Sequence, residues 1–363
     1  MRCVIHIGTE KTGSTAIQRY LLHHKDELSL SGVHCCESYG KGNNRAFAAA
    51  FTAPDRRDDY FRQNDLDDPE SRKQWFESLA AQFDTELQET GETIGTFLIS
   101  SEHLHSRLQS ASEVRAVADF VLPRFSSVEI RCYLRRQDEL ALSRFSEALR
   151  AGYAPPALLP KGQRPLSTQP APYFDYAALL DRWALAFGDA AVHPRIFSRE
   201  SLFKGDVVAD FLQSIGQRKA PESKVIRANE ALPATTQAAI YMLNRHMAKP
   251  HSVEGRVLRK RLVAMAEQMG ISGDSLLPCK TAARNFYQKF EAGNREVAKR
   301  WFGRDTLFVE DFSRYPLEST RLDSSRVASL LGGLLLAVAG EGENSDSFGP
   351  VLPKKPLPDF NWS

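Results

Sequence analysis

The chain has 363 residues, of which 42% are hydrophobic and 25% charged, and its formal net charge is +2. This length can bury a sizeable core, either as one large domain with a helical appendage or as two domains. The balanced charge gives no reason to expect a nucleic-acid or membrane-surface partner. The five cysteines include no CxxC pair and no zinc-site spacing, so we expect reduced thiols, a cytoplasmic protein and no structural metal.

The first predicted strand, Arg2–Ile7, is followed directly by a glycine-containing loop and a helical pattern. Because MRCVIHIG lacks a small-residue cleavage site, we interpret it as a strand and not as a signal peptide. GVHCC predicts the second strand, and further strands are predicted at Thr96–Ser100, Val128–Leu134 and Ala191–Ile196. Helical patterns alternate with these strands, which predicts an α/β fold: a P-loop-like three-layer arrangement with a mostly parallel central sheet flanked by helices.

The second half of the chain is predicted to be helical. A stretch with six prolines, residues 154–172, is either a lid or acceptor-binding segment or a surface excursion. Apolar residues at helical spacing then predict helices at Ala234–Lys249, Val253–Met269 and Thr281–Phe302. Val327–Ala339 is too short to span a bilayer, so we expect no transmembrane segment there but a packed helix, with an interfacial anchor as the alternative.

This pattern predicts an organisation in three parts. Residues 1–225 form the α/β core, residues 226–340 form a helical part of the same domain, and residues 341–363 form a loosely ordered tail rich in Gly, Pro, Ser and charge.

The loop after the first strand, GTEKTGST from Gly8 to Thr15, predicts an anion site. Its glycines permit positive φ angles and a close approach of backbone N–H groups to an anion, and the following helix adds the positive end of its dipole. Ser14 stands where the P-loop motif of nucleoside triphosphatases has its lysine. The lysine, Lys11, lies in the middle of the loop, and no strand ends in a Walker B type Asp. We therefore expect group transfer without a metal.

The loop resembles the 5′-phosphosulfate loop of the sulfotransferases that use 3′-phosphoadenosine 5′-phosphosulfate (PAPS). In that family a Lys or Arg, then Ser/Thr and Gly, then Ser/Thr-Thr follow the first strand and open a helix. The matching residues here are Lys11, Thr12, Gly13, Ser14 and Thr15. The resemblance implies that PAPS is the co-substrate, that Lys11 stabilises the leaving bridging oxygen, and that Gly8, Thr9 and the rest of the loop hold the 5′-phosphate.

A second family motif consists of an Arg at a strand end and a Ser eight positions later, which bind the 3′-phosphate of the donor. In CYLRRQDELALSRFSEAL these positions hold Arg135 and Ser143, with Arg136 as the alternative arginine. A guanidinium group suits a phosphate dianion because it can bind in a bidentate manner. RANEALP and NREVAKRWFGRDTLF resemble the carboxyl halves of bacterial sulfotransferase-like proteins associated with surface carbohydrates, which implies a hydroxyl of a carbohydrate or glycolipid precursor as acceptor.

The junction ISSEHLH supplies the candidate bases, just past the strand Thr96–Ser100. Glu102 is preferred because it comes first after the strand, where a partly desolvated carboxylate can accept a proton; the alternative is a residue that only stabilises a helix N-terminus. His103 is the second candidate, since imidazole titrates near neutrality, and His105 is the third.

Several polar residues near the site keep more than one interpretation. Lys41, Asn43, Asn44 and Arg45 in YGKGNNR either meet a polar acceptor or form a solvated loop, and His6 is interpreted as a buried partner on the first strand. Two other functions stay open: a kinase or nucleotidase with an atypical phosphate loop, which would prefer ATP with magnesium, and a non-catalytic nucleotide-binding protein. The sequence names neither the acceptor nor the oligomeric state.

Overall fold

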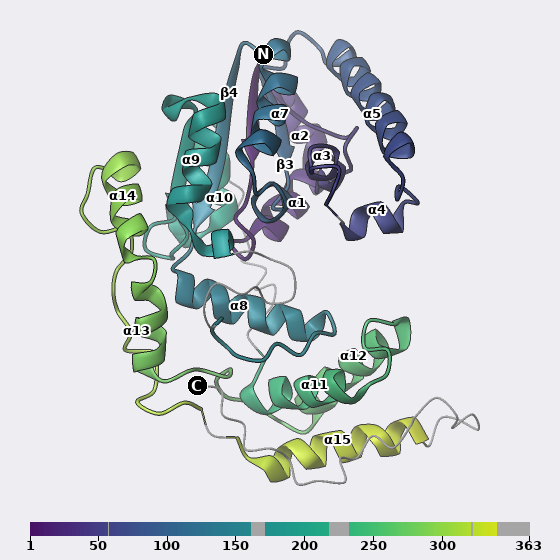
Figure 1. Cartoon of the computed structure of the whole chain (residues 1–363), viewed down its shortest axis with the longest axis vertical. Helices are drawn as coiled ribbons and strands as arrows, with labels where there is room; N and C mark the ends of the chain where they lie inside the picture. Colours follow the sequence, from purple (N-terminus) through teal and green to yellow (C-terminus); the bar gives the residue numbers. More distant parts are fainter. Residues whose placement is uncertain (57, 161–170, 218–231, 321, 340–363) are drawn as a thin grey trace. The chain divides into compact units, whose positions relative to one another are not determined.

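The computed structural model describes residues 1–56, 58–160, 171–217, 232–320 and 322–339 (Figure 1). Their contacts divide the chain into two compact units. The first unit consists of the described residues within Met1–Arg136, Gln169–Ala228 and Glu291–Phe308. The second consists of the described residues within Gln137–Thr168, Asn229–Phe290 and Val309–Ser363. The division by sequence near residue 225 stays a prediction, and both the centre of the proline-rich stretch and the tail after residue 340 lie outside the described residues.

The first unit is built on a parallel sheet of five strands in the order β2-β3-β1-β4-β5. The strands are β1 (Arg2–His6), β2 (Val33–Cys35), β3 (Thr96–Ser100), β4 (Ser127–Leu134) and β5 (Val192–Ile196). The predicted α/β fold with a mostly parallel central sheet is confirmed, and each strand lies within one residue of its predicted bounds at either end. Because the strands are parallel, their carboxyl ends share one edge of the sheet, where ligands bind in folds of this kind.

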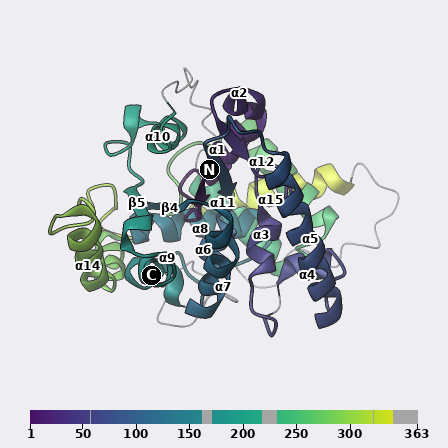
Figure 2. The ribbon, with the colours of Figure 1, turned by 90° about the horizontal axis from the view of Figure 1, so that it is seen from above.

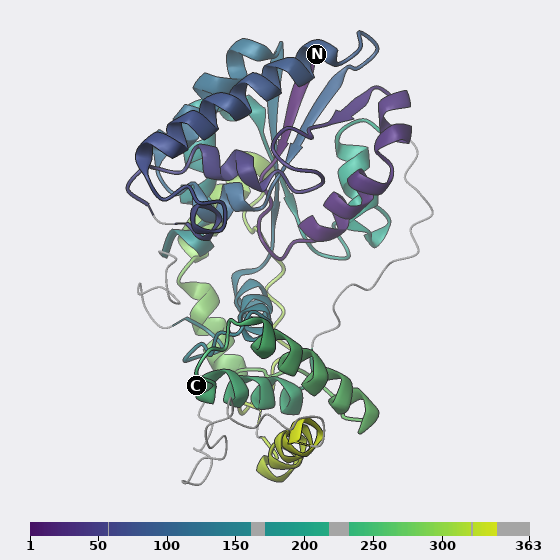
Figure 3. The same cartoon turned by 90° about the vertical axis from the view of Figure 1, so that its right-hand side faces the viewer.

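Helices cover both faces of this sheet (Figures 2 and 3). Adjacent strand residues point to opposite faces, and so Leu98 packs in a cluster with Ile17 and Phe211, whereas the ring of Phe97 lies 5.4 Å from that of Phe83. The first cluster belongs to α1 (Ser14–His23), α2 (Lys25–Leu30) and α10 (Val207–Ser214); the opposite face carries α5 (Pro69–Glu89), α7 (Ala111–Val121) and α9 (Tyr176–Phe187). The remaining helices of the unit are α3 (Arg45–Ala50), α4 (Asp59–Gln63), α6 (His103–Arg107) and α14 (Glu291–Phe302).

A buried carboxylate ties α10 to the sheet. Asp210 accepts hydrogen bonds from the Tyr133 hydroxyl at 2.7 Å, from Arg195 Nε and Nη2 at 2.5 and 2.7 Å, and from the Phe203 N–H at 2.9 Å. Burial raises the pKa of Asp210, but the hydrogen bonds from Arg195, Phe203 and Tyr133 outweigh it and leave that pKa below its ordinary value. The carboxylate therefore stays ionised and joins β4, β5 and α10.

The second unit is helical. It contains α8 (Gln137–Arg150), α11 (Ala234–His246), α12 (Val253–Gln268), α13 (Lys280–Gln288) and α15 (Ser324–Ala339). The apolar side of α15, with Val327, Leu330 and Leu334 buried, packs in one cluster with residues of α8, α11 and α12, as predicted for a packed helix (Figure 1). None of the helices in the described part of the chain combines the length and apolarity needed to cross a membrane.

One predicted helix is wrong. The stretch Thr281–Phe302 forms two helices, α13 and α14, which belong to different units. The N–H groups of Lys289 and Phe290 bond to carbonyls three residues earlier, which tightens the end of α13 and stops the four-residue repeat. The apolar spacing continues across this break, and so the pattern alone did not reveal it.

Candidate active site

The anion loop, residues Gly8–Thr15, runs from β1 to α1 at the carboxyl edge of the sheet. Gly8 and Gly13 have φ angles of +98° and +83°, values at which a side chain would be strained. Lys11 also lies in the left-handed region, with φ of +64°. Thr9 fastens the loop to β4, because its N–H and its hydroxyl both donate to the Tyr133 carbonyl, at 3.1 and 3.0 Å.

Two buried hydroxyls of the loop are used to hold its shape. Thr12 and Ser14 donate to the Thr9 carbonyl at 2.6 and 3.1 Å. In contrast, the backbone N–H groups of Gly13, Ser14 and Thr15, at the start of α1, have no hydrogen-bond acceptor among the described residues, and the Thr15 side chain is exposed. The loop can therefore hold an anion through backbone N–H groups at a helix N-terminus.

Arg135 lies beside this loop. It follows β4 directly, and its Nη1 donates to the Lys11 carbonyl at 3.2 Å. Its own N–H donates to the Tyr176 hydroxyl at 3.3 Å, and its guanidinium carbon is 5.6 Å from the centre of the Phe197 ring. A guanidinium group and the lysine-bearing loop thus meet at one edge of the sheet.

The other two residues of the predicted 3′-phosphate motif differ in their position. Arg136 is buried, with 7% of its surface exposed. Ser143 is half-buried on α8 and belongs to the second unit, whereas Arg135 belongs to the first. The pairing of Arg135 with Ser143 therefore stays a prediction.

Glu102 lies directly against the anion loop. It is the N-cap residue of α6, and a Cβ placed on Gly8 would be 3.1 Å from both the Cα and the Cβ of Glu102. Its carboxylate accepts hydrogen bonds from Gln18 Nε2, at 2.5 Å to Oε2, and from Asn43 Nδ2, at 3.2 Å to Oε1 and 3.3 Å to Oε2. The absence of a side chain on Gly8 is what permits this approach of a carboxylate to the loop.

The two histidines after Glu102 are in different environments. Burial and, next to it, the positive charge of Arg45 lower the pKa of His103 to about 4, so this imidazole is neutral at pH 7. Its Nδ1 is buried without a hydrogen-bond partner in the described part of the chain. His105 is buried, and its Nε2 lies 3.1 Å from the Tyr173 carbonyl oxygen, an arrangement in which it donates to that carbonyl. Its Nδ1 lies 3.5 Å from the backbone nitrogen of Glu10 in the anion loop, and its place as the third candidate base stays a prediction.

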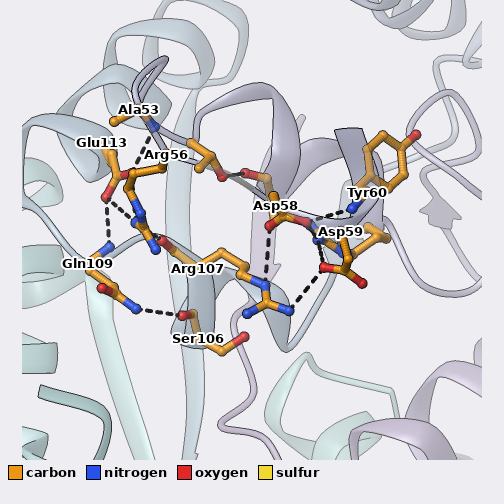
Figure 4. Close-up of polar contacts among 12 residues, drawn as sticks. Ala53, Arg56, Asp58, Asp59, Tyr60, Ser106, Arg107, Gln109 and Glu113 are labelled. Carbon is orange, nitrogen blue, oxygen red and sulfur yellow. Dashed lines mark hydrogen bonds and ion pairs between the residues drawn. The ribbon is translucent and has the colours of Figure 1, made fainter. Parts of the chain in front are cut away.

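A network of charged side chains fixes the far end of α6 (Figure 4). Arg107 Nε and Nη2 lie 3.2 and 3.3 Å from the carboxylates of Asp58 and Asp59, and Arg45 pairs with the same two residues. Arg56 bonds to the Arg107 carbonyl and lies 2.9 Å from Glu113. Since this network holds α6 to the chain around residues 53–60, it also fixes the helix whose first turn carries Glu102 and His103.

The loop YGKGNNR is docked on the sheet through Asn44, whereas Lys41 in its middle is exposed to solvent. The buried Asn44 donates to the carbonyls of Cys36 and Gly40 at 2.9 and 2.7 Å, and its Oδ1 accepts from the Ser100 N–H at 2.7 Å. Two three-residue turns surround it: the Asn43 N–H bonds to the Lys41 carbonyl, and the Arg45 N–H bonds to the Asn43 carbonyl. These contacts place Asn43 beside the end of β3.

His6 is a buried partner, as expected from the sequence. Its Nδ1 lies 2.8 Å from Ser100 Oγ, its ring packs near those of Tyr133 and Phe211, and burial lowers its pKa to about 3. Within the described ranges, no three His, Cys, Asp or Glu side chains gather where a metal ion could bind.

Sequence reasoning missed one member of the site and named another without its role. Gln18 was not singled out, although it follows Ser14 by four residues and therefore lies on the same face of α1. Asn43 was named as a polar loop residue, but its contact with Glu102 depends on the docking of the loop against β3.

Comparisons with known proteins give two likenesses. No model of a known protein family matches the chain. An uncharacterized protein of Archaeoglobus fulgidus is 26% identical over 183 residues, which are 50% of this chain and 48% of that protein, so the chain spans about half the length of this curated relative. The crystal structure of a sulfotransferase from Alicyclobacillus acidocaldarius is similar over 70% of this chain and 98% of its own, with 15% identity and a TM-score of 0.38.

Proposed function

We propose that the chain is a sulfotransferase that moves the sulfuryl group of PAPS to a hydroxyl of an acceptor, a carbohydrate or glycolipid precursor. The observation that carries this proposal is the meeting of three groups at one sheet edge. These are the anion loop with Lys11 in its middle, the guanidinium of Arg135 on the Lys11 carbonyl, and the carboxylate of Glu102 beside Gly8.

The reaction assigns one task to each of these groups. The acceptor oxygen forms a bond to sulfur, the bond from sulfur to the bridging oxygen breaks, and 3′,5′-adenosine bisphosphate leaves. Glu102 takes the proton of the acceptor hydroxyl, with His103 as the alternative base. Burial and the charge of Arg45 lower the pKa of His103 to about 4, which makes it a weaker base than an ordinary imidazole. Lys11 stabilises the charge that develops on the leaving oxygen.

The loop geometry supports backbone binding of the 5′-phosphate. Thr12 and Ser14 donate their hydroxyl hydrogens to the Thr9 carbonyl, so the N–H groups of Gly13, Ser14 and Thr15 are the donors that remain for the phosphate. The 3′-phosphate is bound by Arg135 together with Ser143 or Arg136.

Two measurements test this proposal. Calorimetric titration should give binding of 3′,5′-adenosine bisphosphate without magnesium, and tighter binding than ATP with magnesium; the reverse order would favour a kinase or nucleotidase. Incubation with PAPS that carries labelled sulfate, together with fractionated glycans and lipids, should then label one acceptor fraction.

The Lys11→Ala variant separates catalysis from binding alone. It should lower the rate of labelling by a factor on the order of 10²–10³, the usual cost of one lost charge-stabilising group. The matched control is Lys73→Ala, which removes an exposed lysine of α5. If wild-type protein binds the bisphosphate but labels no fraction, the chain is a non-catalytic nucleotide-binding protein.

A further inference from the structure

Glu102 is held by two side-chain amides that come from separate segments. Gln18 on α1 donates to Oε2 at 2.5 Å, and Asn43 after β2 lies 3.2 Å from Oε1 and 3.3 Å from Oε2. Both donors are neutral. An arginine or lysine in their place would stabilise the anion more strongly and make the carboxylate a poorer base, whereas these two amides orient the carboxylate without adding a positive charge.

We propose that Gln18 and Asn43 are positioning residues that fix the Glu102 carboxylate beside the anion loop, so that it can take the proton of the acceptor hydroxyl. This inference rests on the proposed function, because it assigns both amides to the general base of that reaction. Neither residue is required to touch the donor.

The surrounding contacts fix both amides without a ligand. Asn43 Oδ1 accepts a hydrogen bond from Ser101 Oγ at 2.9 Å, which turns Nδ2 toward Glu102. Asn44, the next residue, is bonded to β3, so the loop cannot move away without breaking buried hydrogen bonds. Gln18 is 7% exposed, and its backbone lies close to Gly42 of the same loop. Such prior ordering is what an active-site base needs.

Other charged groups lie on the elements around Glu102, and any change in its titration has to be compared with them. They are Glu10 and Lys11 in the anion loop, His103 and His105 on α6, and Lys41 and Arg45 on the docked loop and α3. The variants below change none of these groups, so a difference from wild type reports the amide contacts.

The first test replaces one amide by an acid of the same shape. Asn43→Asp keeps the acceptor for Ser101 but puts a carboxylate oxygen opposite Glu102. In protein with ¹³C-labelled glutamate carboxyl groups, with the signal assigned by Glu102→Gln, the titration of Glu102 should move up by about one pH unit or more, because a second negative charge disfavours ionisation. Asn64→Asp, at the exposed end of α4, should leave it unchanged. If Asn43→Asp does not fold, Gln18→Glu gives the same readout.

The second test removes a donor without adding charge. Gln18→Met keeps the length of the side chain and should lower turnover about tenfold or more, since hydrogen bonds to charged groups are the strong ones. The affinity for 3′,5′-adenosine bisphosphate should change by less than about twofold. The matched control, Gln82→Met on the exposed side of α5, should alter neither quantity.

The outcomes separate this inference from the function on which it rests. An unchanged Glu102 titration in Asn43→Asp overturns the positioning role, and so does equal loss of bisphosphate affinity and turnover in Gln18→Met, because the amides would then serve the loop. If wild-type protein transfers no sulfate although the titration shifts, the proposed function fails, and with it the assignment of the amides to a general base.

Discussion

The contact of the anion loop with α10 can be tested with a single methyl group. Gly13 has φ of +83°, and a Cβ placed there would lie 2.7 Å from Cγ1 of Val207 on α10. Because valine is stiff at χ1, it cannot turn this methyl group away easily. Gly13→Ala should therefore lower the free energy of unfolding by about 1–2 kcal/mol because of the left-handed backbone and by about 1–3 kcal/mol because of overpacking. The total loss is about 2–5 kcal/mol.

A double-mutant cycle separates these two contributions. Urea unfolding at pH 7 gives the free energies of wild type, Gly13→Ala, Val207→Ala and the double variant. Val207→Ala should recover about 1–3 kcal/mol of the loss in Gly13→Ala, the part due to overpacking. Gly303 is the control, because it has φ of +60° and a Cβ placed there would meet no other atom of the described chain within 4 Å. Its alanine variant should show only the backbone cost.

The same variants report on ligand binding. If the proposed function holds, Gly13→Ala should weaken binding of 3′,5′-adenosine bisphosphate, because it displaces the first N–H groups of α1, and Gly303→Ala should not. The reasoning is refuted if Gly13→Ala destabilises no more than Gly303→Ala, or if Val207→Ala recovers none of the loss.

Three further changes address the core and the base. Burial holds the pKa of His6 at about 3 in the folded protein, whereas it is near 6.5 in the unfolded chain, so the unfolded state binds more protons between these values. The contribution of His6 to stability is complete above pH 6.5 and should fall by about 2 kcal/mol between pH 7 and pH 5. Urea unfolding at several pH values should therefore show a loss of stability that is about 2 kcal/mol smaller in His6→Phe than in wild type, and unchanged in His246→Phe, at an exposed site. Asp210→Ala leaves the guanidinium group of Arg195 and the buried hydroxyl of Tyr133 without their acceptor, and should lower the free energy of unfolding by about 3–5 kcal/mol. A loss below about 1 kcal/mol would contradict the buried network. Glu102→Gln should lower turnover on the order of 10²–10⁴-fold with bisphosphate affinity retained, and full activity of this variant would move the role of base to His103.

Local signals were sufficient for the sheet and the anion loop. The strands are short apolar runs bounded by turns. The loop contains glycines, and the structure shows positive φ angles at two of them, Gly8 and Gly13. The boundaries of the helices were harder to predict from the sequence. No proline or glycine separates α13 from α14 at Lys289 and Phe290, so the apolar spacing predicted one helix where the chain forms two.

The candidate site was accessible only in part for a similar reason. Lys11, Arg135 and Glu102 were found because each follows a strand, and parallel strands bring their carboxyl ends together. Gln18 and Asn43 contact Glu102 across 84 and 59 positions of the chain, and such pairings depend on how α1 and the docked loop pack. The neutral state of His103 likewise follows from burial, which spacing does not encode.

The two consecutive tight turns around Asn44 make the length of the docked loop critical. Surface connections usually tolerate an inserted or deleted residue. Here Asn43 and Asn44 carry the same side chain but have different duties, one facing Glu102 and the other satisfying the backbone of β3. A deletion of one residue before Asn43 would move Asn44 into the place of Asn43 and Arg45 into the place of Asn44. The backbone of β3 would then lose its amide partner, although the composition of the loop barely changes. During evolution, the sequence of this segment should therefore change by substitution at Lys41 and not by a change in length.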